Sequence, residues 1–440
     1  MERPAAWRYA YLVGQLILAG FVVYAYDIEG QAFQRVFALA LMGFVINLWL
    51  PLDFRRPFFV MLSLAGAVVV FGPADAAWLV GCGLLLIGLC HLPVRFGLRV
   101  LLLLLTGGLL ATSRAGALPS SWSAAVWPIL GSMFMFRLAL YIRAVRMKQV
   151  ENGLWGPLAY FFMLPNLAFP LFPVVDYQTF RRTYYDRGDI AIYEQGLVWI
   201  SRGLVHLLLY RLVYQNFLGD PADVVTLGDL TQLMLSTFLL YLRVSGQFHL
   251  IVGILHLFGF RLPETHNLYY LAHNFTELWR RINIYWKDFM MQVVFYPAYF
   301  KLKQLGPRPA LACATAAVFL VTWVLHSYQW FWLRGGFPVA LPDILFWGIL
   351  GTLVVAGALR ESRPGHRSRK RVSGWDWRLG VRAAGTFFTF CFLWSLWSTE
   401  SVSQWLWMLG AATEVDAKGI VLLVATFGQL VVLGGRDWDA

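Results

Sequence analysis

The chain has 440 residues, of which 59% are hydrophobic, 17% aromatic and only 14% charged. Soluble globular chains carry about 45–50% apolar and about 25% charged residues. Too few polar side chains remain to cover a water-soluble surface of this size, which excludes a cytosolic enzyme, a secreted disulfide-rich domain and a disordered regulator. The composition predicts an all-α, polytopic integral membrane protein.

The charge balance fits this class. The 36 Lys and Arg residues exceed the 24 Asp and Glu residues by 12, and the positive-inside bias of cytoplasmic loops accounts for such an excess. The sequence contains no recognised nucleic-acid-binding module, so we expect no nucleic-acid partner.

Metal and disulfide chemistry have little support in the sequence. All four cysteines lie inside apolar runs and none belongs to a CxxC pair: Cys82, Cys90, Cys313 and Cys391. There is no HExxH pair, Walker loop or GxSxG elbow. His249 and His256 share a helix face two turns apart, a spacing too loose for a metal site and more typical of packing. We expect neither a metal nor a bound cofactor.

Spanning helices dominate the chain from its start. An apolar run from Tyr9 to about Tyr26 follows Arg3 and Arg8, and it lacks the short core and small-residue cleavage site of a signal peptide. It is therefore expected to be an uncleaved first span. Spans need about 20 mostly apolar residues, and the further candidates lie near 33–50, 57–72, 76–93, 98–112, 122–142, 190–217, 227–260, 309–333, 341–359, 379–397 and 419–434.

One hydrophobic stretch, 157–175, differs from these spans. It contains four prolines: Pro157, Pro165, Pro170 and Pro173. Proline removes a helical hydrogen-bond donor and disfavours helix before it, so this stretch is expected to be broken or re-entrant. Together with the other candidates it predicts about 11–13 hydrophobic segments in one continuous helical domain.

Two long stretches carry more charge than a lipid-facing helix tolerates. The stretch 227–260 contains Arg243, Gln247, His249 and His256. The stretch 265–303 mixes many aromatic residues with the charged or titratable residues His266, His273, Glu277, Arg280, Arg281, Lys287 and Asp288. Both are therefore predicted to line a water-filled or protein-enclosed cavity. The basic loop 360–371 is interpreted as a topogenic cytoplasmic loop, with recognition of anionic lipid or of an acidic carrier protein as the alternative.

His326 is the strongest candidate for chemistry. It lies in the apolar run Phe319–Trp332, and an ionisable group at membrane depth is a functional candidate. Histidine is also well suited to accept and return a proton near neutral pH. The alternative is a histidine that forms a hydrogen bond to a neighbouring helix.

The segment WRRINIYW offers a second group of candidates. Asn283 can hold a substrate carbonyl or orient an imidazole, although an interhelical hydrogen bond is the simpler reading. Glu277 and Arg281 are four residues apart and can pair on a helix face. Trp279 and Trp286, seven apart, are predicted to share another face of the same helix. An amphipathic helix at the membrane boundary and direct contact with substrate phosphates both remain open. Asn274 begins a glycosylation sequon that we do not expect to be used.

Four ordered segments resemble the membrane-bound O-acyltransferase family. The run GFRLPETHNLYYLAHNFTELWRRINI, Gly259–Ile284, is similar to the family's central signature, with Phe275, Glu277, Trp279, Arg280 and Arg281 in register. Ser245-Gly246, Gly253 and Leu257–Phe260 resemble the segment before it. Pro173–Tyr177 with Phe180 resembles an earlier segment, and Trp323–His326 with Trp330 matches the place of the family's intramembrane histidine. These segments cover about residues 157–335 in the family's order.

The sequence also departs from the family's pattern at several positions, and these differences bear on which molecule would be acylated more than on the type of reaction. Asn283 stands where many bacterial polysaccharide-modifying members have histidine, whereas members that acylate lipids or proteins often have asparagine. Phe172 replaces a glycine, Gln247 and His249 replace the usual Tyr and Asp, and Ser327 follows His326 where glycine is common.

The resemblance implies transfer of an acyl group, acetyl or another short chain, from a thioester to a hydroxyl, inside a helical fold with a central tunnel. His326 would be the general base, and Asn283 would assist at the carbonyl. The donor would be acyl-CoA or an acyl-carrier thioester. The residues expected to bind substrate are Trp279, Arg280, Arg281, Glu277, Trp286, Lys287, Tyr177 and Trp330.

The resemblance also implies partners and a location. The acceptor would be a cell-surface glycan or glycolipid, with a lipid, sterol or protein as the alternative, and an extracytoplasmic acyltransferase is a possible partner. The chain would be a multi-pass protein of the inner, cytoplasmic membrane, in contact with membrane lipid. We expect one domain, with N-terminal helices in 1–150, the core in 157–335 and C-terminal helices in 336–440. A transporter and a catalytically silent scaffold remain alternatives.

Overall fold

The computed structural model describes residues 6–169, 175–363 and 374–436, which form helices and two isolated β-bridges without any β-strand. In these ranges twelve helical segments are long and apolar enough to cross a membrane. Each of the twelve spans predicted from the sequence corresponds to one of them, which confirms an all-α, multi-pass membrane protein. Arg3, Pro170, Phe172, Pro173, Val174 and residues 364–371 of the basic loop lie outside the described residues.

The chain forms two compact units, each described here by itself. The first unit comprises Met1–Leu207, Val244–Pro263 and Tyr328–Phe337. Its helices are α1 (Ala6–Ala25), α2 (Gly30–Trp49), α3 (Leu52–Phe71), α4 (Pro73–His91), α5 (Phe96–Arg114), α6 (Met135–Arg146), α7 (Trp155–Phe161), α8 (Tyr177–Arg182), most of α9 (Asp189–Asn216) and most of α11 (Tyr241–Leu257).

Helices α9 and α11 approach closely because both present glycine at the contact. A Cβ on Gly253 would lie 2.7 Å from the carbonyl oxygen of Gly196, and one on Gly203 would lie 2.8 Å from that of Gly246. Small residues at such positions let two spanning helices pack backbone to backbone. Every residue of α11 from Ser245 to Leu257 is buried, so this part of the charged stretch 227–260 is enclosed by protein. His249 stacks on Trp199 with ring centres 5.1 Å apart, in line with the packing role expected for it.

The proline-rich stretch is broken, as predicted. Helix α7 spans only Trp155–Phe161, a single 3-10 turn follows at Leu164–Leu167, and α8 begins at Tyr177. Around it the side chain of Arg137 is fully buried and donates a 3.0 Å hydrogen bond to the carbonyl oxygen of Phe161. A buried guanidinium that donates to a buried helix-end carbonyl satisfies two groups whose burial without a partner would be costly.

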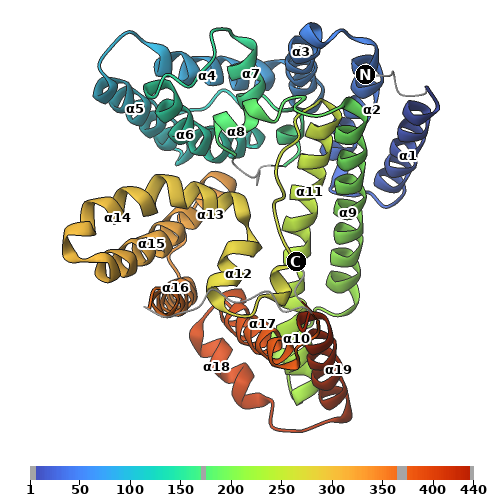
Figure 1. The fold of residues 1–440 in the computed structure, drawn as a ribbon, viewed down its shortest axis with the longest axis vertical. Helices are drawn as coiled ribbons and strands as arrows, with labels where there is room; N and C mark the ends of the chain where they lie inside the picture. Colours follow the sequence, from blue (N-terminus) through green and yellow to red (C-terminus); the bar gives the residue numbers. More distant parts are fainter. Residues whose placement is uncertain (1–5, 170–174, 364–373, 437–440) are drawn as a thin grey trace. The chain divides into compact units, whose positions relative to one another are not determined.

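The second unit comprises Leu208–Arg243, Glu264–Ser327 and Pro338–Ala440. Its helices are α10 (Leu227–Leu239), α12 (Phe275–Ile282), α13 (Ile284–Met290), α14 (Tyr296–Leu302), most of α15 (Pro307–Arg334), α16 (Leu341–Glu361), α17 (Trp377–Ser398), α18 (Val402–Ala411) and α19 (Ala417–Gly434). Helices α10, α17 and α19 pack together, while α13 and α14 lead out to a turn from which α15 returns (Figure 1).

Helix ends tie α10 and α19 to each other. Asp416 caps α19 by accepting from the backbone N–H of Gly419 at 3.2 Å, and it also accepts from the N–H of Gly228 in the first turn of α10 at 2.8 Å. One carboxylate thus satisfies orphan donors of two helix N-termini, where the helix dipoles also favour negative charge. The turn Tyr269–Leu271 before α12 packs on α17 and α19 of this layer, while α12 itself packs on α16.

Candidate active site around His326

His326 lies in the interior of α15, and its imidazole is half-buried. Its Nδ1 is 2.9 Å from the carbonyl oxygen of Thr322, one turn earlier. Because a carbonyl oxygen only accepts, Nδ1 must carry the proton of the neutral ring, which leaves the lone pair on Nε2. Within the described residues no hydrogen-bond partner occupies Nε2. The helix itself therefore sets the tautomer that a general base requires.

Three indole rings from three helices surround this imidazole. The ring centre of His326 is 5.5 Å from Trp286 of α13, 4.7 Å from Trp347 of α16 and 6.2 Å from Trp397 of α17. Aromatic faces carry negative quadrupole charge and attract a cation within about 6 Å. The centres of two of the three rings, those of Trp286 and Trp347, lie within this distance of the imidazole.

Hydrogen bonds hold two of these indoles in place. The indole N–H of Trp286 donates to the hydroxyl of Thr322 at 3.3 Å, and that of Trp397 donates to the carboxylate of Asp343 at 2.5 Å. Thr322 thus contacts His326 through its carbonyl and Trp286 through its hydroxyl. Buried indole N–H groups that find partners fix the ring orientation, so the enclosure is ordered rather than merely crowded.

Asn283 breaks the helix that contains the signature. Helix α12 ends at Ile282, Asn283 adopts φ −153° and ψ 89°, and α13 begins at the next residue. The Oδ1 of Asn283 accepts from the backbone N–H of Trp286 at 3.0 Å, which is the N-cap geometry that asparagine favours. The prediction that Trp279 and Trp286 share one helix face is therefore wrong, since the two residues belong to different helices. The carboxamide N–H₂ of Asn283 has no partner in the part of the chain that is described.

Two hydrogen bonds from other segments stabilise this break. The hydroxyl of Tyr241 donates to the carbonyl oxygen of Ile282 at 2.8 Å, and the N–H of Ile284 donates to the carbonyl oxygen of Thr265 at 2.9 Å. Tyr241 has only one hydroxyl proton, so at the 3.1 Å contact with His266 the Nε2–H of the imidazole is the donor. Backbone groups that a continuous helix would pair internally are thus satisfied from outside.

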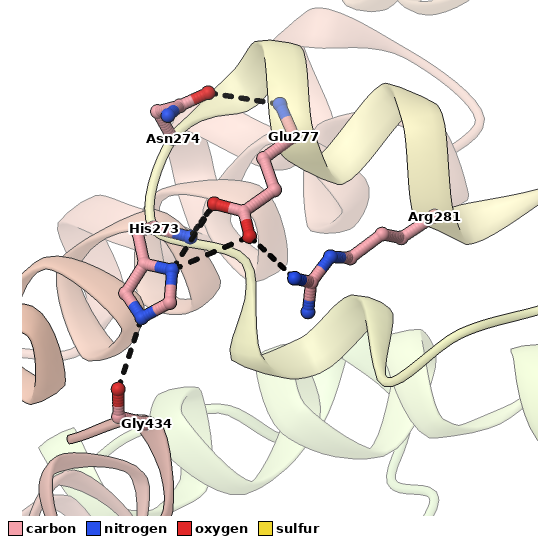
Figure 2. Close-up of polar contacts among 5 residues, drawn as sticks. All are labelled: His273, Asn274, Glu277, Arg281 and Gly434. Atoms are coloured by element: carbon pink, nitrogen blue, oxygen red, sulfur yellow. Dashed lines mark hydrogen bonds and ion pairs between the residues drawn. The ribbon is translucent and has the colours of Figure 1, made fainter. Parts of the chain in front are cut away.

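The first turn of α12 carries a buried charge network (Figure 2). The carboxylate of Glu277 accepts from the backbone N–H of His273 at 2.9 Å, lies 3.1 Å from His273 Nδ1 and pairs with Arg281 at 2.7 Å. The predicted pairing of Glu277 with Arg281 is confirmed. Asn274 caps α12 by accepting from the N–H of Glu277 at 2.8 Å, so its side chain serves the helix start.

The protons of this network follow from its partners. His273 Nε2 lies 2.9 Å from the carbonyl oxygen of Gly434, and Nδ1 faces a carboxylate. Both partners are acceptors, so both ring nitrogens of His273 lie where an N–H can donate. Burial alone would raise the pKa of the Glu277 carboxyl, but the hydrogen bond from His273 and the charge of Arg281 outweigh it and lower that pKa. The network anchors α12 to the end of α19.

The other predicted substrate-binding residues of this unit are also engaged. Arg280 is exposed and pairs with Glu361 at 2.8 Å, and Lys287 pairs with the adjacent Asp288 at 2.7 Å. Trp279 packs on Phe319 of α15 with ring centres 4.6 Å apart. Each basic side chain proposed for substrate phosphates therefore already has a carboxylate partner.

Tyr177 and Trp330 belong to the first unit. Tyr177 is buried, its ring packs edge-on against Tyr141 at 5.3 Å, and burial raises the pKa of its hydroxyl. Trp330 is 36% exposed and lies under the guanidinium of Arg334, 4.1 Å from the ring centre. Tyr177 is thus a core residue of its unit, and Trp330 carries a cation–π contact.

Several residues near His326 and Asn283 have roles that the sequence does not indicate. Trp347 and Trp397 come from later spans, where aromatic residues are common and nothing marks these two. Thr322 was visible as the residue four before His326, the position whose carbonyl a helical histidine can reach. Tyr241 and His266 have no local signal, because their role depends on a loop that returns to the break at Asn283.

Comparison with known proteins adds no assignment. Among the described residues, no group of three or more His, Cys, Asp or Glu side chains is placed to hold a metal ion. No model of a known protein family matches the chain, and no curated protein is significantly similar to it. The resemblance to the O-acyltransferase segments therefore rests on the residues themselves.

Proposed function

We propose that this protein is a membrane-embedded O-acyltransferase of the membrane-bound O-acyltransferase type. It moves an acetyl or other short acyl group from a thioester, acyl-CoA or an acyl carrier, to a hydroxyl of a cell-surface glycan or glycolipid. The proposal includes a tunnel that admits both substrates and a place in the inner membrane. An extracytoplasmic acyltransferase would be a fitting partner for a surface glycan acceptor.

The observation that carries the proposal is the state of His326. Its Nδ1–H is held by the carbonyl oxygen of Thr322, so Nε2 has its lone pair ready in an aromatic enclosure on a membrane-spanning helix. His256 shares this pattern, with Nδ1 2.7 Å from the Val252 carbonyl oxygen and no partner on Nε2 in the described residues. His326 is distinguished from it by the three surrounding indoles and by its place in the resemblance. A hydroxyl is a weak nucleophile until a base removes its proton, and Nε2 is suited to that task.

The reaction then proceeds by addition and elimination. Nε2 takes the proton of the acceptor hydroxyl as its oxygen bonds to the thioester carbonyl carbon, and the carbonyl oxygen becomes negative. The C–S bond then breaks, the ester forms, and the departing thiolate takes the proton back from Nε2. Between these steps the imidazolium keeps its hydrogen bond to the Thr322 carbonyl inside the indole enclosure.

Asn283 supplies the second group. Its Oδ1 is committed to the α13 cap, so its carboxamide N–H₂ is the part that can donate to the developing oxyanion or position the acceptor. Asparagine at this place also keeps acylation of a lipid, sterol or protein as the alternative acceptor class. The phosphates of the acyl donor would compete with the present carboxylate partners of Arg280, Arg281 and Lys287.

The central test uses the purified full-length chain in detergent with short-chain acyl-CoA, and it measures thiol release and acyl transfer to extracted membrane glycans and lipids. His326→Ala should fall to background, whereas His91→Ala, which removes a histidine from a spanning helix of the first unit, should keep the normal rate. A folded His326→Ala protein with wild-type turnover would refute the proposal, and absence of thiol release from the wild type would favour the transporter.

A second variant separates the two parts of Asn283, the capping oxygen and the N–H₂ group. Asp caps a helix as well as Asn does but lacks the N–H₂ group. Asn283→Asp should therefore keep the fold and lose about 10²–10³ in turnover, the usual cost of one oxyanion donor. If Asn283→Asp keeps full turnover, the carboxamide has no part in the reaction.

A further inference from the structure

The turn between α14 and α15 exposes large apolar side chains. Tyr296 is 46%, Phe300 65% and Leu305 57% exposed. The rings of Tyr296 and Phe300 lie on one side of the helical segment, stacked with their centres 6.4 Å apart. We call residues 296–308 the turn surface.

The same surface has an uncompensated positive charge. Its three basic side chains are all exposed: Lys301, Lys303 and Arg308. The sequence contains no Asp or Glu from residue 289 to residue 342. None of the three basic groups has an ion-pair or hydrogen-bond partner within the described ranges, in contrast to Arg280 and Lys287, which are paired. The turn therefore presents free cationic groups directly beside apolar rings.

The adjoining span fixes the depth of this surface. Helix α15 starts at Pro307, has 28 residues and is one of the candidate spans. At about 1.5 Å per residue it is about 42 Å long, close to the thickness of a bilayer with its headgroup layers, about 40–45 Å. Its first turn consequently lies at headgroup level, and so do the residues that immediately precede it.

We propose that the turn surface binds anionic phospholipid headgroups. The phosphates accept from Lys301, Lys303 and Arg308, and the side chains of Tyr296, Phe300 and Leu305 enter the boundary between headgroups and acyl chains. Aromatic rings favour this boundary, and long basic side chains reach from it to the phosphate layer. The positive charge of the turn surface and its depth in the membrane thus both favour an anionic phospholipid headgroup. The proposal is independent of the proposed catalytic activity.

The test compares lipids on the full-length protein. Purified protein in neutral detergent is titrated with dioleoylphosphatidylglycerol or dioleoylphosphatidylcholine, and bound lipid is counted by native mass spectrometry. The wild type should prefer the anionic lipid at least tenfold, less so at high salt. The triple variant K301Q/K303Q/R308Q should lose the preference by about 10- to 100-fold, because each basic residue near an anionic surface contributes separately.

Two controls decide the assignment. The variant R181Q/R182Q/R187Q removes the same net charge near α8 and should keep the preference, and K301R/K303R/R308K should restore it. An unchanged preference in the first triple, or an equal loss in the α8 triple, would overturn the proposal. Displacement of the bound lipid by soluble polyglutamate, with no preference between the two lipids, would overturn it in favour of an acidic protein partner.

Discussion

The variant Glu277→Gln tests what the buried network of α12 contributes. The carboxylate accepts from the backbone N–H of His273 at 2.9 Å and pairs with Arg281 at 2.7 Å. The side chains of His273, Glu277 and Arg281 are only 8%, 20% and 11% exposed. The substitution keeps the shape and one acceptor oxygen but removes the negative charge that the Arg281 guanidinium and the His273 ring face.

The expected loss follows from these contacts. Removing one partner of a buried ion pair costs about 3–5 kcal/mol, because the other charge remains buried and unpaired. The amide oxygen of Gln still accepts one hydrogen bond, so we expect the lower end of that range, about 3 kcal/mol. The exposed pair of Arg280, 58% exposed, with Glu361 provides the matched control, since surface pairs contribute about 0–1 kcal/mol.

The assay is unfolding by a denaturing detergent in mixed micelles, followed by circular dichroism for wild type, Glu277→Gln and Glu361→Gln. In parallel, the KM for the acyl donor is measured. If Glu277 and Arg281 hold the fold, Glu277→Gln loses stability and donor KM stays unchanged in the molecules that remain folded. Equal stability of all three proteins, with a raised donor KM for Glu277→Gln, would refute this reasoning and support a substrate-binding role.

The pH dependence has a definite sign. Because the folded-state pKa of Glu277 is lowered below the unfolded value of about 4.3, its contribution is present above that pH and is lost as the pH falls through the folded pKa. The stability difference between wild type and Glu277→Gln should therefore be constant near neutral pH and shrink below about pH 4. A difference that grows as the pH falls would contradict the assigned charge state.

Three further variants test other contacts. Tyr241→Phe removes the donor to the Ile282 carbonyl; turnover should fall about tenfold with donor KM unchanged, as measured by steady-state kinetics. Gly380→Ala places a methyl against the α19 backbone and should cost about 1–3 kcal/mol in the unfolding assay, whereas Gly385→Ala, which has open space around it, should cost nothing. Asp416→Ala removes the shared cap of α10 and α19 and should cost about 1–2 kcal/mol in the same assay.

Hydropathy was sufficient to locate the spans for a physical reason. Within a bilayer every backbone polar group must be satisfied inside its own segment, so a long apolar run has no alternative to a helix. Helix α5, Phe96–Arg114, illustrates this, since Leu110 is the only residue of this leucine-rich helix that is buried in the protein. The stretch 157–175 is broken after α7 ends at Phe161, and Pro165 lies at the start of the short 3-10 turn that follows, a position that proline tolerates.

The break at Asn283 lies beyond what local patterns reveal. The helical periodicity of charged and aromatic residues runs through it, and that periodicity led to the wrong prediction for Trp279 and Trp286. The break exists because Tyr241 and the backbone of Thr265 satisfy groups on either side of it. Those partners are brought in by tertiary packing, and tertiary packing overrides helical propensity.

Asn283 shows why an interaction inferred from residue type alone stays incomplete. The sequence left open whether its carboxamide bonds a neighbouring helix or meets a substrate, and the structure assigns its oxygen to neither, but to the N–H of Trp286. The indole ring of Trp286 packs against His326 in a T-shaped arrangement, with ring centres 5.5 Å apart, and its N–H donates to the Thr322 hydroxyl. The carbonyl of Thr322 in turn fixes the tautomer of the His326 imidazole. The cap therefore already links Asn283 to the proposed base through protein alone. A loss of turnover in Asn283→Ala would mix this positioning effect with the loss of a donor, and only the capping variant Asn283→Asp separates them.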